Sequence, residues 1–296
     1  MKKLLIVCCG LLFSVPVFAL QGGRSRLEIA YEGMGYSYRE PHMEHPISAK
    51  ADLKNGISLK YTSNEILGGF ASGGEDNSFY SLEARFLKGD VDYRGSTWGG
   101  DPLKADGLTD WYVEGRLLIG QYWDLNDVWK LSPYFGFGYR FLSNHADEMS
   151  GGYRRESTYF YVPVGAGLNW QVGSGWSIAF NGEFDWMLKG NQKSCMSDID
   201  LEYPYEDYSL RDARNDQTKG FGLRASVKLE KELGSFAIFV EPFYRFWKIQ
   251  NSEWEPLMIS NGTESGYIVD ESGMVSGLIE PFNISREYGV RIGIAF

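Results

Sequence analysis

The last nine residues, Tyr288-Gly-Val-Arg-Ile-Gly-Ile-Ala-Phe296, place a large apolar side chain at every second position. Glycine, arginine and alanine occupy the positions between them. Alternation with a period of two is typical of a β-strand that has one apolar face and one polar or small-residue face. The stretch therefore predicts a strand that continues to the final phenylalanine.

The same alternation recurs nine more times along the chain, which gives ten predicted strands, an even number. The upstream strands are predicted within residues 26–37, 50–61, 80–86, 111–119, 135–141, 160–170, 176–186, 221–229 and 236–246. Many of them reach the length of about 9 to 11 residues that a tilted strand needs to cross a membrane. Backbone groups in lipid have no water to bond, so such strands must close into a barrel. We therefore predict an all-β fold, a transmembrane antiparallel β-barrel of ten strands in up-and-down order with long extracellular loops.

The polar face of the predicted strands is almost neutral, with eleven cations against ten anions. The cations are Arg26, Lys50, Lys54, Lys60, Arg85, Arg116, Arg140, Arg224, Lys228, Arg245 and Arg291, and the anions are Glu28, Glu32, Asp52, Glu83, Asp110, Glu114, Glu183, Asp185, Glu241 and Glu287. Charges that are crowded inside a narrow closed barrel have to pair. We therefore expect the charged face inside and the aromatic residues, 16% of the chain, largely outside facing lipid.

The N-terminus has the pattern of a secretory signal peptide over residues 1–19. Lys2 and Lys3 precede an apolar run at residues 4–15, and Val17 and Ala19 suit a cleavage site. A membrane anchor is the alternative, but the run is shorter than the ~20 residues that a spanning helix needs. Residues 20–296 are then predicted to form a single barrel domain, in which Cys195 is the remaining cysteine.

Charge and loop length give the expected orientation and partners. The formal charge of −10 argues against a nucleic-acid partner, because nucleic-acid binders show a basic footprint. Short turns at 171–174 and 230–234 are expected in the periplasm, and longer loops at 40–48, 90–108, 142–155, 190–217 and 250–283 outside. The last of these has six acids and no lysine or arginine. Such an acidic rim either attracts cationic peptides or proteins, or only binds divalent cations and keeps the surface solvated.

The ending at Phe296 resembles the C-terminal signal of bacterial outer-membrane barrels, and four internal stretches resemble the omptins, ten-stranded outer-membrane proteases. These stretches are Asp90-Val-Asp92-Tyr93, Phe135-Gly-Phe-Gly-Tyr139, Val162-Pro-Val-Gly165 and Asp198-Ile-Asp200-Leu-Glu202-Tyr203. The resemblance implies a site at the extracellular mouth in which Asp90 and Asp92 hold a water and Asp200 and Glu202 form the opposing pair. The stretch 152–165 is also similar to outer-membrane proteins of the Protochlamydia type, a resemblance that implies no activity.

One of these positions departs from the omptin pattern, because Glu202 stands where the family has its catalytic histidine. A histidine exchanges protons near neutral pH, whereas a fourth carboxylate would raise the pKa of its neighbours. The cluster would then suit an acid-shifted endopeptidase or a divalent cation, or would no longer cleave peptides. His42 and His45, in the first external loop, and His145 do not obviously replace the missing base.

Three functions therefore stay open: a non-catalytic surface or interaction barrel, an omptin-type endopeptidase that acts on basic peptides, and a small pore. We expect no cofactor and no bound metal. Outer-membrane lipid, including lipopolysaccharide, is expected around the barrel, although the Tyr-x-Glu-x-Arg lipid-binding pattern of omptins is replaced by Tyr139-Arg-Phe-Leu-Ser143. The expected location is the bacterial cell outer membrane.

Overall fold

The computed structural model describes residues 25–41, 47–64, 77–96, 101–201, 207–270 and 272–296. The predicted signal peptide, residues 1–19, lies outside this part of the chain. In the described ranges, no helix has the length and apolar character that crossing a membrane requires.

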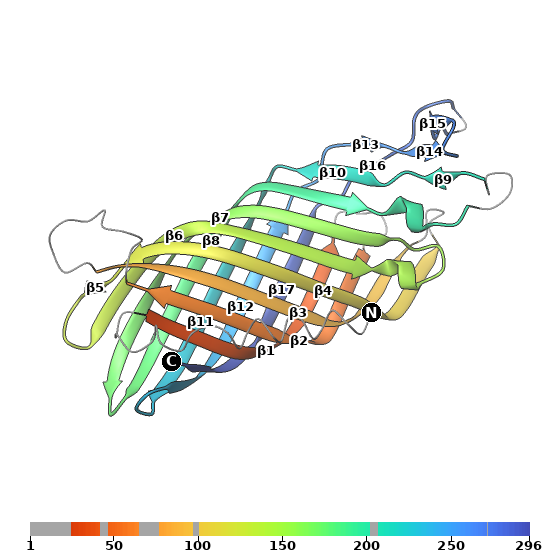
Figure 1. Ribbon diagram of the computed structural model, residues 1–296. Coiled ribbons are helices and arrows are strands. Elements are labelled where there is room, and N and C mark those ends of the chain that lie inside the picture. Colours follow the sequence, from red (N-terminus) through yellow and green to blue (C-terminus); the bar gives the residue numbers. More distant parts are fainter. Residues whose placement is uncertain (1–24, 42–46, 65–76, 97–100, 202–206, 271) are drawn as a thin grey trace.

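Ten long antiparallel strands form the body of the molecule, and each predicted strand corresponds to one of them, with Phe236 and Phe296 one residue outside the observed bounds (Figure 1). They are β1 (Ser25–Glu40), β2 (Ile47–Ser63), β3 (Ser78–Ser96), β4 (Pro102–Gln121), β6 (Trp129–His145), β7 (Arg154–Gly173), β8 (Trp176–Ser194), β11 (Gly220–Glu232), β12 (Ala237–Ile249) and β17 (Asn283–Ala295). Sequential strands pair with one another, and β17 pairs with β1 from Ala295 opposite Glu28 to Ile284 opposite Arg39. This last pairing closes the sheet, so the predicted ten-stranded up-and-down barrel is confirmed.

The two faces of the barrel wall have the predicted inside-out character. On β17, Ile292 is 59% exposed on the outer face, whereas Glu287 is only 1% exposed in the lumen. Because side chains alternate along a strand, the apolar phase forms an outer belt and the charged phase fills the interior.

Shorter elements lie between the long strands. They are β5 (Trp123–Asp124), η2 (Ala146–Glu148), η3 (Met196–Asp198), β9 (Ser209–Leu210), β10 (Ala213–Gln217), β13 (Glu255–Pro256), β14 (Met258–Ser260), β15 (Ser265–Tyr267) and β16 (Gly277–Leu278). All but β5 lie at one end of the barrel, which we call the long-loop end; at the upper right of Figure 1, β9 and β13 to β16 extend beyond the barrel strands. At the opposite end, β7 and β8 join through Ser174 and Gly175, whose positive φ angles of 52° and 74° match the twist of a tight hairpin.

Two expectations about the strands are wrong. The loop predicted at 90–108 is mostly strand, because β3 continues to Ser96 and β4 already begins at Pro102. Within these extensions, the inward-facing Val91 and Leu108 pack in an apolar cluster. Asp90 and Asp92 therefore lie within β3. The regular alternation predicted through 50–61 is interrupted by a register shift between Lys50 and Lys54.

This shift reverses the direction of two charged side chains. Ala51 and Lys54 are both buried, so the phase changes between them, and the side chains of Lys50 and Asp52 are 65% and 91% exposed. These two residues pair with each other on the outer face, 3.0 Å apart, instead of in the lumen.

Candidate functional site: a bridged lumen and an acidic long-loop end

Ion pairs bridge the lumen from one wall to the other. Arg140 on β6 donates to Glu287 on β17 at 2.5 Å, and Arg224 on β11 donates to Glu114 on β4 at 2.6 Å. Around the sheet, β6 and β17 are five strands apart in either direction. These contacts therefore cross the barrel and do not run along its wall.

Tyrosine hydroxyls and a further arginine complete this layer. The hydroxyl of Tyr161 donates to Glu114 at 2.5 Å, and that of Tyr112 donates to Glu287 at 3.3 Å. Arg245 donates to Glu32, which is fully buried, at 2.6 Å. Buried charges of this kind are tolerated only where partners compensate for the lost hydration. Here Glu114 and Glu287 accept hydrogen bonds from across the lumen, and Glu32 accepts one from Arg245, two strands away.

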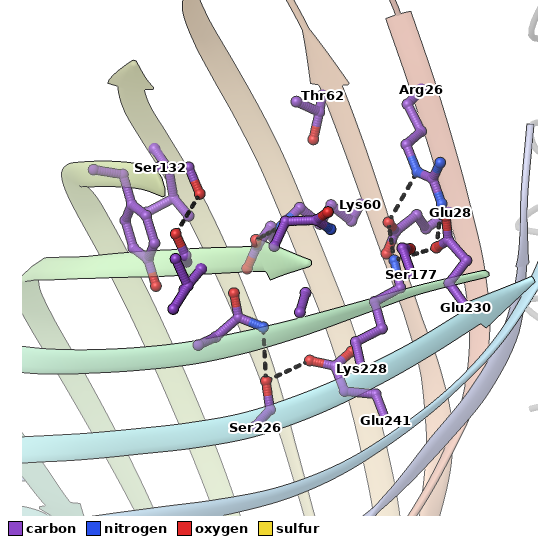
Figure 2. Close-up of a pocket in the computed structure, with 18 of the residues that line it drawn as sticks. Arg26, Glu28, Lys60, Thr62, Ser132, Ser177, Ser226, Lys228, Glu230 and Glu241 are labelled. Carbon is purple, nitrogen blue, oxygen red and sulfur yellow. Dashed lines mark hydrogen bonds and ion pairs between the residues drawn. The ribbon is translucent and has the colours of Figure 1, made fainter. Parts of the chain in front are cut away.

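A cavity of about 700 Å³ lies on the short-turn side of this layer. Figure 2 shows that its wall carries many charged side chains, which are paired with one another. Lys228 donates to Glu28 at 2.5 Å, and Ser226 donates to Glu241 at 2.6 Å. The wall groups named here therefore satisfy each other.

A second, smaller cavity of about 80 Å³ lies towards the long-loop end. Tyr36, Tyr38, Tyr93, Tyr159 and Trp247 form its aromatic walls, and Arg155 and Glu280 are among its polar lining residues.

Two glutamates share the arginine of this cavity. Arg155 donates to both carboxylate oxygens of Glu280 at 2.5 and 2.6 Å and lies 3.5 Å from Glu40, which also accepts a hydrogen bond from Tyr38 at 2.6 Å. Our reading of the sequence missed this group, because Tyr38, Glu40 and Arg155 lie beyond the predicted strand ends. Continuing the alternation of β1 would have placed Tyr38 and Glu40 inside.

The structure places three of the four acids of the predicted catalytic site, and Glu202 lies outside the described residues. Asp90 and Asp92 are exposed on the outer side of β3, because Val91 between them is fully buried and faces inward. Asp92 accepts a hydrogen bond from the Gly107 amide at 3.2 Å. Asp200 is exposed in the segment after η3.

The described contacts do not bring these three acids together. No hydrogen bond or ion pair among the described residues joins Asp90, Asp92 and Asp200, and the first two point away from the lumen. A catalytic role for the four acids therefore stays a prediction, without a described geometry that holds a water between opposing carboxylate pairs.

The histidines add no clear base to this group. His42 and His45 lie outside the described residues. His145 accepts a hydrogen bond from the Trp111 indole at 3.3 Å, and its Nδ1 lies 3.5 Å from Asp147. The first contact joins β4 to β6, and the second joins the end of β6 to η2.

The elements at the long-loop end have a small core of their own and an acidic surface. Met196, Leu210, Ala213 and Leu257 are buried together beneath β9 and β14. The acids of this end that the structure describes include Glu253, Glu255, Glu264, Asp270 and the buried Glu280, in a segment without lysine or arginine.

One acid at this end is strongly anchored. Burial alone would raise the pKa of Asp212, but hydrogen bonds from Lys193 at 2.8 Å and from the Ser197 hydroxyl at 2.7 Å outweigh this effect and lower the pKa. Asp212 therefore ties the segment after η3 to the rim of β8 as a carboxylate.

Comparisons with known proteins give the fold but no sequence relative. No protein-family model matches the chain, and no curated protein matches it in sequence. Among solved structures, the outer membrane protease OmpT from Escherichia coli is similar with a TM-score of 0.55 at 9% identity, covering 93% of this chain and 97% of OmpT. The translocator domain of the autotransporter NalP from Neisseria meningitidis has a TM-score of 0.39 at 11% identity, covering 98% and 95% of the two chains. The chain thus has the fold of a bacterial outer-membrane β-barrel and shares its ten-stranded architecture with the omptin OmpT.

Proposed function

We propose that this protein is an integral barrel of the bacterial outer membrane that acts as a surface interaction protein and neither conducts solutes nor cleaves peptides. The observation that carries the proposal is the bridged lumen, in which Arg140–Glu287 and Arg224–Glu114 join opposite walls. A barrel of this size has little interior space once side chains fill it. The functional surface is then the external end.

The charge of that end defines the partner that we propose. A field of one sign raises the local concentration of oppositely charged molecules and speeds their arrival. Residues 250–283 carry only acidic charge, so cationic peptides or proteins are the favoured partners. Exposed apolar side chains in the same segment, Trp254, Tyr267 and Met274, would add contact area to such a complex.

The alternative that the sequence raised is an omptin-type endopeptidase. It would use Asp90 and Asp92 with Asp200 and Glu202, and the fold shared with OmpT is compatible with it. The outward direction of Asp90 and Asp92 favours the non-catalytic proposal, because a shared water would have to lie between acids that face one another.

The test is to incubate the refolded barrel in detergent with arginine- and lysine-rich peptides from pH 4 to pH 8. We expect saturable binding that weakens with salt, and no cleavage. Binding should fall when Glu253, Glu255 and Glu264 are changed to Gln, and not when the exposed acids Asp124 and Asp127, at the short-turn end, are changed to Asn. Cleavage that disappears in Asp92→Asn but persists in Asp52→Asn would contradict the proposal and establish the endopeptidase.

A further inference from the structure

Three cations gather on the outer wall of the barrel, on the adjacent strands β12, β17 and β1. They are Lys248, Arg286 and Arg39. Their neighbours along the chain, Ile249, Glu287 and Glu40, are buried in the lumen, so alternation directs the three cations outward. This cluster was not singled out in the sequence, because all three cations lie outside the predicted strands.

The strand register places the three side chains next to one another. Ile284 on β17 is paired with Lys248 on one side and with Arg39 on the other, so these two cations flank it at one level. Arg286 lies two residues further along β17 and is therefore the diagonal neighbour of both. Diagonal neighbours on one sheet face are separated by about 7–8 Å, within reach of long side chains.

The cluster lies at the outer edge of the apolar belt. Tyr244 and Tyr288 are paired directly with each other and are 41% and 54% exposed, one step nearer the middle of the barrel than Arg286. Val290, Ile292 and Ile294 continue the exposed apolar surface beyond them. Tyrosines typically mark the interface between membrane and water, so the three cations stand at the level of the lipid headgroups.

None of the three cations forms an ion pair with a described carboxylate. Lys248 lies over the Phe282 ring at 5.4 Å, and Arg286 lies over the Phe246 ring at 5.9 Å. On β8, by contrast, Lys189 pairs with Asp216 at 3.3 Å and Lys193 pairs with Asp212 at 2.8 Å. The cluster thus concentrates positive charge that the described carboxylates leave uncompensated, although the protein as a whole is acidic.

We propose that Lys248, Arg286 and Arg39 form a binding site for the phosphate-bearing headgroup of a lipid in the outer leaflet. Arginine and lysine are the side chains that bind phosphate oxygens, and basic clusters at the membrane surface recognise anionic lipids. The exposed apolar strand faces below the cluster would contact the acyl chains of the same molecule. The site rests on the membrane location proposed above, but not on the binding of cationic partners.

The experiment measures retention of diphosphoryl lipid A by the refolded full chain in a neutral detergent. The variant is Arg39→Gln with Lys248→Gln and Arg286→Gln, and the matched control is Lys50→Gln with Lys189→Gln and Lys193→Gln. The control removes the same charge from outward cations that already have acidic partners. We expect the first variant to lose affinity about 100-fold, the order expected for three surface cations, and the control to change it less than about fivefold.

Further arms identify the ligand. A lipid A without phosphates should bind much more weakly, and excess inorganic phosphate should displace little of the intact lipid. The single change Arg39→Gln, at an exposed position, should still lower affinity several-fold if the triple variant does not refold. Equal loss in variant and control, equal binding of the dephosphorylated lipid, or complete displacement by inorganic phosphate would overturn the proposal.

Insertion into zwitterionic vesicles, followed by flotation, tests the membrane location separately. Wild type and both triple variants should float equally, because the apolar belt is the same in all three. A wild-type chain that does not float would overturn the membrane location itself, and with it the lipid site.

Discussion

Arg140 and Glu287 join strands that are five apart in either direction around the barrel, with Nη2 and Oε1 at 2.5 Å. Arg245 lies 3.3 Å from the other oxygen of Glu287, which also accepts a hydrogen bond from Tyr112. Glu287 immediately precedes the C-terminal alternating stretch 288–296. β17 therefore both closes the barrel by pairing with β1 and carries the carboxylate that binds Arg140 on the opposite wall.

Glu287→Gln is expected to destabilise the barrel strongly. The change removes the partner of two buried guanidinium groups, and breaking a buried pair from one side typically costs about 3–5 kcal/mol. Urea unfolding of the barrel in detergent, followed by tryptophan fluorescence, measures the effect.

Glu156→Gln is the control for this loss. It breaks the more exposed pair with Arg154, 3.3 Å apart, and should cost less than about 1 kcal/mol. Similar losses of unfolding free energy in the two variants would show that the ion pairs of Glu287 contribute no more to stability than an exposed pair.

The bridged lumen predicts that the wild-type protein does not conduct. In planar bilayers the current should stay at the baseline of the protein-free membrane, because side chains of opposite walls meet across the interior. Removing both bridges, with Glu114, Arg224, Arg140 and Glu287 all changed to Ala, should produce discrete current steps if the barrel still inserts. Steps of similar size in the wild-type protein would contradict a closed lumen.

A glycine makes room for one of the bridging groups. A Cβ built on Gly138 would overlap the ring of Tyr161, the residue whose hydroxyl donates to Glu114 and accepts a hydrogen bond from Arg224 at 2.9 Å. Gly138→Ala should therefore displace this ring and lower the urea midpoint by an amount equivalent to about 1–3 kcal/mol.

Gly115→Ala is the matched control on the neighbouring strand. A Cβ at Gly115 meets no atom within 4 Å, and Gly115 is paired with Tyr139, next to Gly138 in sequence. Its substitution should leave the midpoint nearly unchanged. If both substitutions have the same effect, strand propensity and not the space for Tyr161 explains the loss.

The fold could be predicted from the sequence because period-two alternation is a local signal that each strand repeats. The balance of charges on the polar face also predicted pairing inside the barrel, and Arg116 with Glu83, at 3.1 Å, is one such pair. The partners themselves could not be predicted, because Arg140 and Glu287 are 147 residues apart in sequence.

The candidate site was less predictable, for two physical reasons. The strands continue past the last strongly alternating residue, so Asp90 and Asp92 were expected in a loop and instead lie on the outer face of β3. The register shift before Lys54 reverses the direction of Lys50 and Asp52, and such irregularities leave no clear trace in the pattern of apolar residues.

The Asp212 anchor should respond to acid. Its pKa is lowered in the folded protein, so the stabilisation is fully present above the ordinary aspartate pKa of about 3.9 and is lost as the pH falls through the lower folded value. The Ser197 amide, which donates to Asp212 at 3.2 Å, should lose hydrogen-exchange protection over this range of pH. In Asp212→Asn, protection of this amide should be lower at neutral pH and should no longer change with acid; an unchanged acid response would assign it to another group.

Cys195 should be unreactive and unpaired in the folded protein. The residue is 1% exposed, burial raises the pKa of its thiol, and its amide is held by the Arg154 carbonyl at 2.9 Å. Because the thiolate is the reactive form, maleimide at neutral pH should label the folded barrel at least about tenfold more slowly than the urea-unfolded chain. Once residues 1–19 are removed, Cys195 is the single cysteine of the chain. The control is Ser150→Cys in a Cys195→Ser background, which places one thiol at an exposed position that should be labelled rapidly. Fast labelling of native Cys195, or a disulfide-linked dimer on a non-reducing gel, would mean that the chain around Cys195 opens far more readily than the burial of this residue indicates.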